Sequence, residues 1–288
     1  MNPESSPARA ALDPVPLHEL AAQLRLGFIK VLATSGSTNT ELAQLASSGA
    51  AGHLSVLFSE HQQQGKGRLG REWVTPAGSA ITLSVLASPG SAMEPESLSW
   101  YTMLAALAWS QAVEELAPVQ ARIKWPNDLL AGDRKICGIL AQLVQTPQGF
   151  AVVVGTGINV DQEASELPVA TATSLRLASG TRVDRGELLA EYLRRFTALD
   201  AAFRAVGGQS TASLGEYSGR SLRDLVAARL ATLEQDVRVE FPDGSQLLGR
   251  AVQLAADGAL VVENASGQSQ RILAGDVHHV RRADGKYA

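Results

Sequence analysis

The stretch 121-ARIKWPNDLLAGDRKICGILAQLV-144 contains two apolar runs separated by Gly132 and Asp133. A Gly–Asp pair between runs rich in Leu and Ile is typical of a two-residue β-hairpin turn. The pattern therefore predicts a β-hairpin across this stretch. Another apolar run, 151-AVVVGTGINV-160, follows almost at once and predicts the next strand.

The predicted turn also fixes a register within the hairpin. If Gly132 and Asp133 form the turn, Lys135 lies opposite Leu130, and Asp128 shares a face with Leu130. Lys135 and Asp128 would then be diagonal neighbours about 7 Å apart, within reach of a lysine side chain. They would either share a site or form an exposed ion pair contributing under ~1 kcal/mol, and spacing alone favours the exposed pair.

Helical patterns flank these strands. A strand-like run at 28–33 precedes a helix that the spacing Thr38-x-x-Glu41 predicts to begin with a capping box. Residues 97–116 carry a helical period, and residues 184–206 form a helix pattern that begins at an aspartate cap. Several strands in succession between helices favour an α+β fold with a mixed or largely antiparallel sheet.

The pattern changes near Asp236 to short strands separated by turn signals, which predicts a small β-barrel. We therefore divide the chain into an N-terminal tail of residues 1–26, a main α+β domain of residues 27–232 and a C-terminal β-barrel domain of residues 233–288.

Composition excludes several function classes. The 288 residues include 25 basic and 29 acidic side chains, so there is no basic excess for nucleic acid and none is expected as a partner. The most apolar stretch, residues 100–113, is shorter than the ~20 residues of a membrane span, so no membrane insertion is expected. Cys137 is the single cysteine, and residues 1–10 do not resemble a secretory signal. A cytoplasmic protein is predicted.

Two glycine-containing segments are candidates for ligand binding. The loop 65-GKGRLGR-71 combines three glycines with three cations, which suits a phosphate, although residue types alone favour a mobile surface turn. The segment 155-GTGIN-159 is weak evidence for a nucleotide, because glycines also occur wherever two backbones pack closely. Trp73 and Trp125 would either stack on a base or fill core volume. The five histidines lack metal-ligand spacing, so no metal site is predicted.

Taken together, four segments in this order resemble the biotin–protein ligases, which attach biotin to a lysine of biotin-dependent carboxylases. They are 37-STN-39, 60-EHQQQGKGRLGREW-73, 124-KWPNDLLAGDRKICGIL-140 and 155-GTGIN-159. The resemblance spans about residues 27–282. It implies that residues 27–232 are a catalytic domain and that the terminal barrel corresponds to the family's SH3-like C-terminal domain.

The resemblance implies a role for particular residues. It implies that biotin is bound by Ser37, Thr38, Asn39, Gln62, Lys66, Gly67, Arg68, Lys135, Gly138 and Gly157. It implies that ATP is bound by Gly65, Arg71, Trp73, Asn127 and Asn159. Lys135 and Arg68 would be the catalytic cations, and Asp128 would orient or deprotonate the attacking amine.

The implied reaction has two steps. The biotin carboxylate attacks the α-phosphorus of ATP to give biotinyl-5'-AMP and pyrophosphate, and a carrier lysine then attacks the acyl carbon. The expected co-substrate is ATP with Mg²⁺, the expected substrate is biotin, and no tightly bound metal is expected. The expected partner is the biotin carboxyl carrier protein domain of acetyl-CoA carboxylase or another biotin-dependent carboxylase, and a homodimer is left open.

Two departures from the family pattern are visible. Lys66 stands where the family commonly has arginine, and an ammonium group cannot make a bidentate contact. About 26 residues precede Phe28, so the helix-turn-helix domain and repressor activity of some members are not expected. A lipoate-type protein ligase and a non-enzymatic ligand-responsive regulator are the alternatives, although the KWPND and GKGRLGR runs favour biotin.

Overall fold

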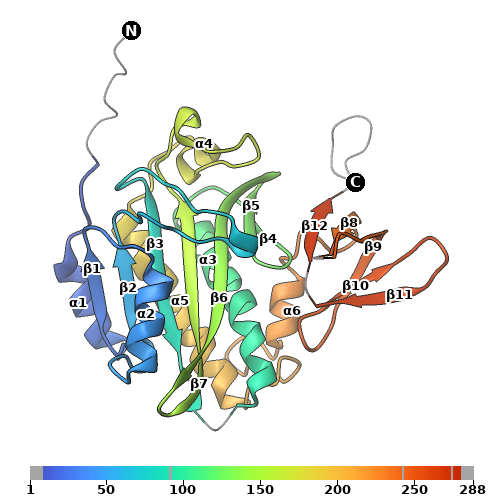
Figure 1. The fold of residues 1–288 in the computed structure, drawn as a ribbon, viewed down its shortest axis with the longest axis horizontal. Coiled ribbons are helices and arrows are strands. Elements are labelled where there is room, and N and C mark those ends of the chain that lie inside the picture. Colours follow the sequence, from blue (N-terminus) through green and yellow to red (C-terminus); the bar gives the residue numbers. More distant parts are fainter. Residues whose placement is uncertain (1–8, 91–92, 242, 274, 280–288) are drawn as a thin grey trace.

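The computed structural model describes residues 9–90, 93–241, 243–273 and 275–279. Its main element is a seven-stranded mixed sheet with the order β1-β2-β3-β7-β6-β5-β4 (Figure 1). β1 and β2 are parallel and all other neighbours are antiparallel, as the α+β prediction required. The strands are β1 Ile29–Leu32, β2 Val56–Ser59, β3 Ala80–Ala87, β4 Ala121–Lys124, β5 Asp128–Ala131, β6 Arg134–Thr146 and β7 Gly149–Asn159.

Helices cover the two faces of this sheet unequally. The long helices α3 and α5 bury one face, where the largest apolar cluster contains Ile81, Leu83 and Val154. α2 covers only part of the other face, where a smaller cluster includes Leu42 and Val153. Part of the second face is therefore not covered by a helix and is available for a binding site. The helices are α1 Pro14–Gln23, α2 Thr38–Ser47, α3 Tyr101–Leu116, α4 Leu175–Ser179, α5 Arg185–Ala205 and α6 Leu222–Ala227.

The stretch 121–144 forms three strands rather than one hairpin. β4 and β5 are separated by residues 125–127, because Pro126 has no N–H for a strand ladder and the chain turns there. The predicted turn at Gly132 is confirmed, and so is the pairing of Lys135 with Leu130. The register shifts between Leu129 and Leu130, so the hairpin also contains a bulge that the sequence did not indicate.

The predicted capping box is wrong. Ser37 is the N-cap of α2, and Thr38 is already helical. The hydroxyl and amide of Thr38 donate to Gln62, so this side chain is not available as a cap. Glu41 instead accepts hydrogen bonds from the Ser35 hydroxyl and the Gly36 amide, which fastens the loop before the helix.

The C-terminal strands form a five-stranded antiparallel sheet with the order β11-β10-β9-β8-β12. Their positions match the predicted short strands, but the described residues do not close into the expected barrel. Within the described residues, β11 and β12 lie at opposite edges of the sheet, and β12 pairs with β8 alone. The strands are β8 Asp236–Glu240, β9 Gln246–Leu254, β10 Leu260–Glu263, β11 Ser269–Ile272 and β12 Asp276–His279.

The predicted N-terminal tail is packed where the structure describes it. Leu17 and Leu20 of α1 are buried in the main apolar cluster. Arg9 forms ion pairs with Asp161 and Glu166, which follow β7. The sequence of residues 1–10 predicts a mobile tail, which is wrong for Arg9 and Ala10, since the ion pairs of Arg9 and a hydrogen bond from Arg185 to the carbonyl of Ala10 hold them. Residues 1–8 lie outside the described part of the chain. No helix in the described part is long and apolar enough to cross a membrane.

Candidate active site

A cavity of about 980 Å³ lies over the half-covered face of the main sheet. Its floor is a row of residues paired across four strands: Gly157, Gly138, Asp128 and Lys124. Because paired residues project from the same face of a sheet, this row places two charged side chains next to two glycines. The central strands thus form a shallow floor with charged groups at the β4–β5 end.

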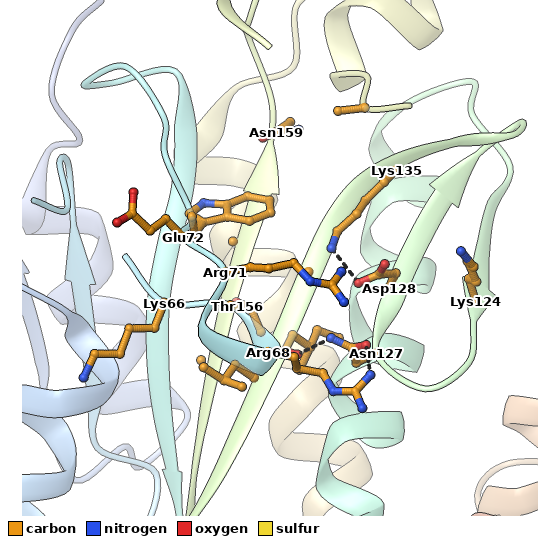
Figure 2. Close-up of a pocket in the computed structure, with 18 of the residues that line it drawn as sticks. Lys66, Arg68, Arg71, Glu72, Lys124, Asn127, Asp128, Lys135, Thr156 and Asn159 are labelled. Carbon is orange, nitrogen blue, oxygen red and sulfur yellow. Dashed lines mark hydrogen bonds and ion pairs between the residues drawn. The ribbon is translucent and has the colours of Figure 1, made fainter. Parts of the chain in front are cut away.

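The loop 65–73 passes over this floor (Figure 2). Within this loop, Trp73 packs directly on the glycines of the floor. A Cβ atom at Gly157 would lie 2.3 Å from Cε2 of Trp73, and one at Gly138 would lie 3.3 Å from Cζ3 of the same ring. A Cβ at Gly155 would lie 2.1 Å from Oδ1 of Asn39. The glycines of the 155-GTGIN-159 motif therefore admit large side chains against the sheet.

Polar side chains occupy the end of the cavity near α2. Oε1 of Gln62 accepts hydrogen bonds from the amide of Thr38 at 2.8 Å and from its hydroxyl at 3.1 Å. Nδ2 of Asn39 donates to the carbonyl of Leu140 at 2.9 Å. Ser37 lines the same end and is buried. These contacts hold donors and acceptors in fixed directions, as recognition of a small polar ring system requires.

Lys135 and Asp128 meet on the floor of the cavity. Lys135 Nζ lies 2.7 Å from Asp128 Oδ1, so the predicted neighbours do form an ion pair (Figure 2). The same Nζ lies 5.8 Å from the ring centre of Trp73. Backbone hydrogen bonds between Lys135 and both Thr171 and Thr173 fix this part of β6. The ammonium group therefore projects into the cavity from a rigid position.

Two arginines of the loop reach across the cavity. Arg68 Nη1 donates to Asn127 Oδ1 at 3.2 Å and lies 3.7 Å from the carboxylate of Asp276. Arg71 forms an ion pair with Asp276, which belongs to β12 of the C-terminal sheet. Burial lowers the pKa of Arg68, with Asp128 acting in the opposite direction. The loop is thus fastened to both sheets by its guanidinium groups.

The remaining predicted residues are placed as follows. Lys66 donates to the hydroxyl of Thr40 at 3.0 Å. Asn159 donates to the carbonyl of Thr173 at 3.0 Å. Gly65 accepts a hydrogen bond from the amide of Trp73 at 2.9 Å and is the one predicted residue that does not line the cavity. Those that do line it are Ser37, Thr38, Asn39, Gln62, Lys66, Gly67, Arg68, Arg71, Trp73, Asn127, Asp128, Lys135, Gly138, Gly157 and Asn159.

Several lining residues were missed by the sequence analysis. Lys124 lies at the end of β4, where its position before Trp125 in the KWPND run was the available signal. Burial lowers the pKa of Lys124, and Asp128 opposes this effect. Asp276 and His278 of β12 and the segment 168–172 also line the cavity. Sequence spacing could not find these, because they come from distant parts of the chain.

Among the described residues there is no cluster of three or more His, Cys, Asp or Glu side chains that could hold a metal ion. The polar groups of the cavity suit an organic ligand with an anionic part. One end offers fixed hydrogen-bonding groups around Gln62, and the other offers cations around Lys135. The arrangement can therefore hold two anions close together while their charges are neutralised.

Comparison with known proteins identifies the family. Residues 31–159 match the model of the biotin/lipoate A/B protein ligase family, and residues 232–280 match the biotin protein ligase C-terminal domain. The biotin--[acetyl-CoA-carboxylase] ligase of Mycobacterium tuberculosis is 35% identical over 256 residues, covering 88% of this chain and 89% of the relative. The chain belongs to the biotin–protein ligase family.

One further relative and one solved structure are also similar to this chain. The biotin--[acetyl-CoA-carboxylase] ligase of Paracoccus denitrificans is 34% identical, covering 79% of this chain and 98% of the relative. The solved biotin protein ligase of Aquifex aeolicus, in complex with biotin and ATP, has a TM-score of 0.71 at 24% identity, covering 88% of this chain and 99% of that one. At 24% identity, the similarity between this ligase and the Aquifex aeolicus structure shows a shared fold.

Proposed function

We propose that the cavity residues carry out the two half-reactions of a biotin–protein ligase. This enzyme activates biotin with ATP to biotinyl-5'-AMP and transfers the biotinyl group to a lysine of a biotin carboxyl carrier protein. The observation that carries the proposal is the single cavity that joins the polar cluster around Gln62 to the cations Lys135 and Arg68.

In the first half-reaction, biotin lies with its ureido ring against Ser37, Thr38 and Gln62, whose fixed polar groups satisfy its donors and acceptor. Its carboxylate then points along the floor toward Lys135. A carboxylate is a weak nucleophile and must approach an anionic phosphate, so positive charge is needed at the meeting point. Lys135 supplies it from the floor and Arg68 from the loop above.

The nucleotide occupies the remaining part of the cavity. Trp73 offers a ring face for stacking, and Asn127, Asn159 and Arg71 offer polar contacts to the nucleotide. Arg71 must exchange Asp276 for a ligand in this arrangement, since the two are paired in the structure. The nucleotide is used as its Mg²⁺ complex, in which phosphate oxygens and water supply most ligands of the ion.

In the second half-reaction, the ε-amine of the carrier lysine attacks the acyl carbon of biotinyl-5'-AMP, and AMP leaves. The amine must be neutral to attack. Asp128 lies on the floor beside Lys135, so its carboxylate can accept a hydrogen bond from the incoming amine and take up a proton. The carrier is a biotin carboxyl carrier protein domain, because the curated relatives are named for acetyl-CoA carboxylase.

The test is direct labelling of a carrier. The purified protein is incubated with ATP, MgCl₂, radiolabelled biotin and a biotin carboxyl carrier domain, and the carrier is counted after gel separation. Label on the carrier, and none on a carrier whose acceptor lysine is alanine, is the expected result. Labelling with radiolabelled lipoate in place of biotin, or no labelling at all, would overturn the proposal.

A further inference from the structure

Three cations of the cavity, Lys66, Lys124 and Arg238, have no part in the mechanism above, and Lys124 differs from the other two in its contacts. Six cationic side chains of the described residues line the cavity: Lys66, Arg68, Arg71, Lys124, Lys135 and Arg238. Five of them contact an oxygen of another side chain. Within the described part of the chain, the ammonium group of Lys124 forms no hydrogen bond and has no carboxylate within 4 Å.

The position of Lys124 is well defined by the sheet. It is the last residue of β4 and pairs directly with Asp128 on β5. Paired residues of adjacent antiparallel strands have Cβ atoms about 5 Å apart, so the two side chains leave the same face together. Figure 2 shows Lys124 on the opposite side of Asp128 from Lys135. The half-buried side chain of Lys124 on β4 thus lies next to the charged pair of Asp128 on β5 and Lys135 on β6.

The direction of attack in the proposed first half-reaction indicates a role for Lys124. The attacking and leaving oxygens of a phosphoryl transfer lie roughly in line with the phosphorus. Biotin approaches from the end of the cavity near Gln62, and the reacting atoms meet at Lys135. The leaving group must therefore depart toward the opposite end, which is formed by β5 and β4 and contains Lys124.

The leaving group also needs a cation there. When the carboxylate oxygen forms its bond to the α-phosphorus, the bond from that phosphorus to the bridging oxygen breaks. The electron pair stays with the pyrophosphate, which gains negative charge. Lys135 and Arg68 are assigned to the reacting carboxylate and the α-phosphate. The ammonium group of Lys124 is next in the row, is half-buried and has no ion-pair partner in the part of the chain that the structure describes, so it is the group that can accept this charge.

We propose that Lys124 binds the terminal phosphates of ATP and stabilises the departing pyrophosphate. This rests on the proposed function, because it takes the direction of attack from the biotin site. Lys124 is then a catalytic residue of the first half-reaction alone. Biotinyl-5'-AMP has no terminal phosphates, so the second half-reaction does not use this contact.

The test compares the two half-reactions in Lys124→Met, which keeps the length of the side chain and removes its charge. We expect adenylate formation at limiting ATP to fall about 10- to 100-fold, the effect of losing one charge-assisted hydrogen bond. Inhibition by inorganic pyrophosphate should weaken by a similar factor. Transfer from supplied biotinyl-5'-AMP to the carrier should stay within about twofold, and Lys124→Arg should restore most of the ATP-dependent rate.

Calorimetric titration with inorganic pyrophosphate gives a readout independent of turnover. Lys30→Met is the control, because Lys30 is exposed on β1 and lies outside the cavity. Unchanged pyrophosphate binding in Lys124→Met overturns the proposal. Equal losses in both half-reactions also overturn it, because Lys124 would then act through Asp128. If Lys124→Met does not fold, Lys124→Gln takes its place in the same assays. Failure of the wild-type chain to label any carrier would instead refute the proposed function.

Discussion

Lys135 Nζ lies 2.7 Å from Asp128 Oδ1, on adjacent strands of the floor of the cavity. Neither residue faces its partner directly across the ladder, since Asp128 pairs with Gly138 and Lys135 with Leu130. Asp128 and Leu130 lie two residues apart on β5 and project from the same face, so Lys135 and Asp128 are diagonal neighbours, as the predicted turn required. The ion pair therefore follows from the turn at Gly132 and is kept despite the bulge between these pairs.

Removing the ammonium group of this pair should abolish most activation of biotin. We expect Lys135→Ala to lose about 100-fold or more of adenylate formation, because one preorganised charge is lost where two anions meet. ATP–pyrophosphate exchange measures this step directly. Lys30→Ala serves as the control for loss of a lysine outside the cavity. Near-normal exchange in Lys135→Ala would contradict its assignment.

The carboxylate of the pair should matter more for transfer than for activation. In Asp128→Asn the side chain keeps its size but cannot take up a proton from the carrier lysine. We expect roughly a 100-fold loss in transfer from supplied biotinyl-5'-AMP and a smaller loss in adenylate formation. Single-turnover assays of the two half-reactions separate these effects. Equal losses would show that Asp128 only positions Lys135.

The contact between Trp73 and the floor should be sensitive to a single methyl group. In Gly157→Ala the new Cβ would lie 2.3 Å from the indole ring, so Trp73 must move. We expect a rise of about 10- to 100-fold in the KM for ATP, since small displacements of a positioning group are costly. Gly52→Ala is the matched control, because a Cβ there has no heavy atom within 4 Å. An unchanged KM would refute the role of Trp73.

Asp276 should restrain the loop 65–71 before ligand binds. It pairs with Arg71 and lies 3.7 Å from Arg68, so Asp276→Asn weakens two contacts to the C-terminal sheet. We expect faster hydrogen exchange of the loop amides in the ligand-free variant than in the wild type. Biotinyl-5'-AMP should then slow exchange in both proteins. Identical exchange of the two ligand-free proteins would argue against this restraint.

A buried ion pair beside the N-terminal segment should contribute to stability. Arg185 Nη1 lies 2.7 Å from Glu60 Oε2, and the two side chains are 7% and 10% exposed. In Arg185→Ala the carboxylate of Glu60 stays buried without this partner, so we expect the free energy of unfolding to fall by about 3–5 kcal/mol. Chemical denaturation measures the change. Arg194→Ala removes an exposed helical pair and should cost under about 1 kcal/mol.

The sequence predicted the class of the fold, and it selected site residues that the structure brings together. Turn residues such as Gly132, helix caps such as Asp184 and alternating apolar runs are local signals, and each was found where it was expected. The resemblance to the biotin–protein ligases could identify the motif residues, because these residues occur in four short segments. Fifteen of the residues so gathered line one cavity.

Local signals failed where a distant contact competed with them. The Thr38 hydroxyl could have capped its own helix, but Gln62, 24 residues away, accepts its hydrogen bond. The hairpin was expected to be continuous, but residues 125–127 turn, and the indole of Trp125 donates to the carbonyl of Gly258. The strands near the C-terminus were found where they were expected, but the described residues of these strands do not close into a barrel.

The amino-acid sequence by itself determined most strands and helices and identified fifteen of the residues that line the cavity, because these depend on periodicity, turn chemistry and short motifs. Tertiary structure alone decided that Lys124 lies beside Asp128 with no ion-pair partner among the described residues, and that Asp276 holds the loop. Sheet register and the approach of β12 bring these groups together across up to 205 residues of chain. Spacing along a sequence can predict a contact within one hairpin, such as that of Lys135 with Asp128, but not contacts between segments this far apart in the chain.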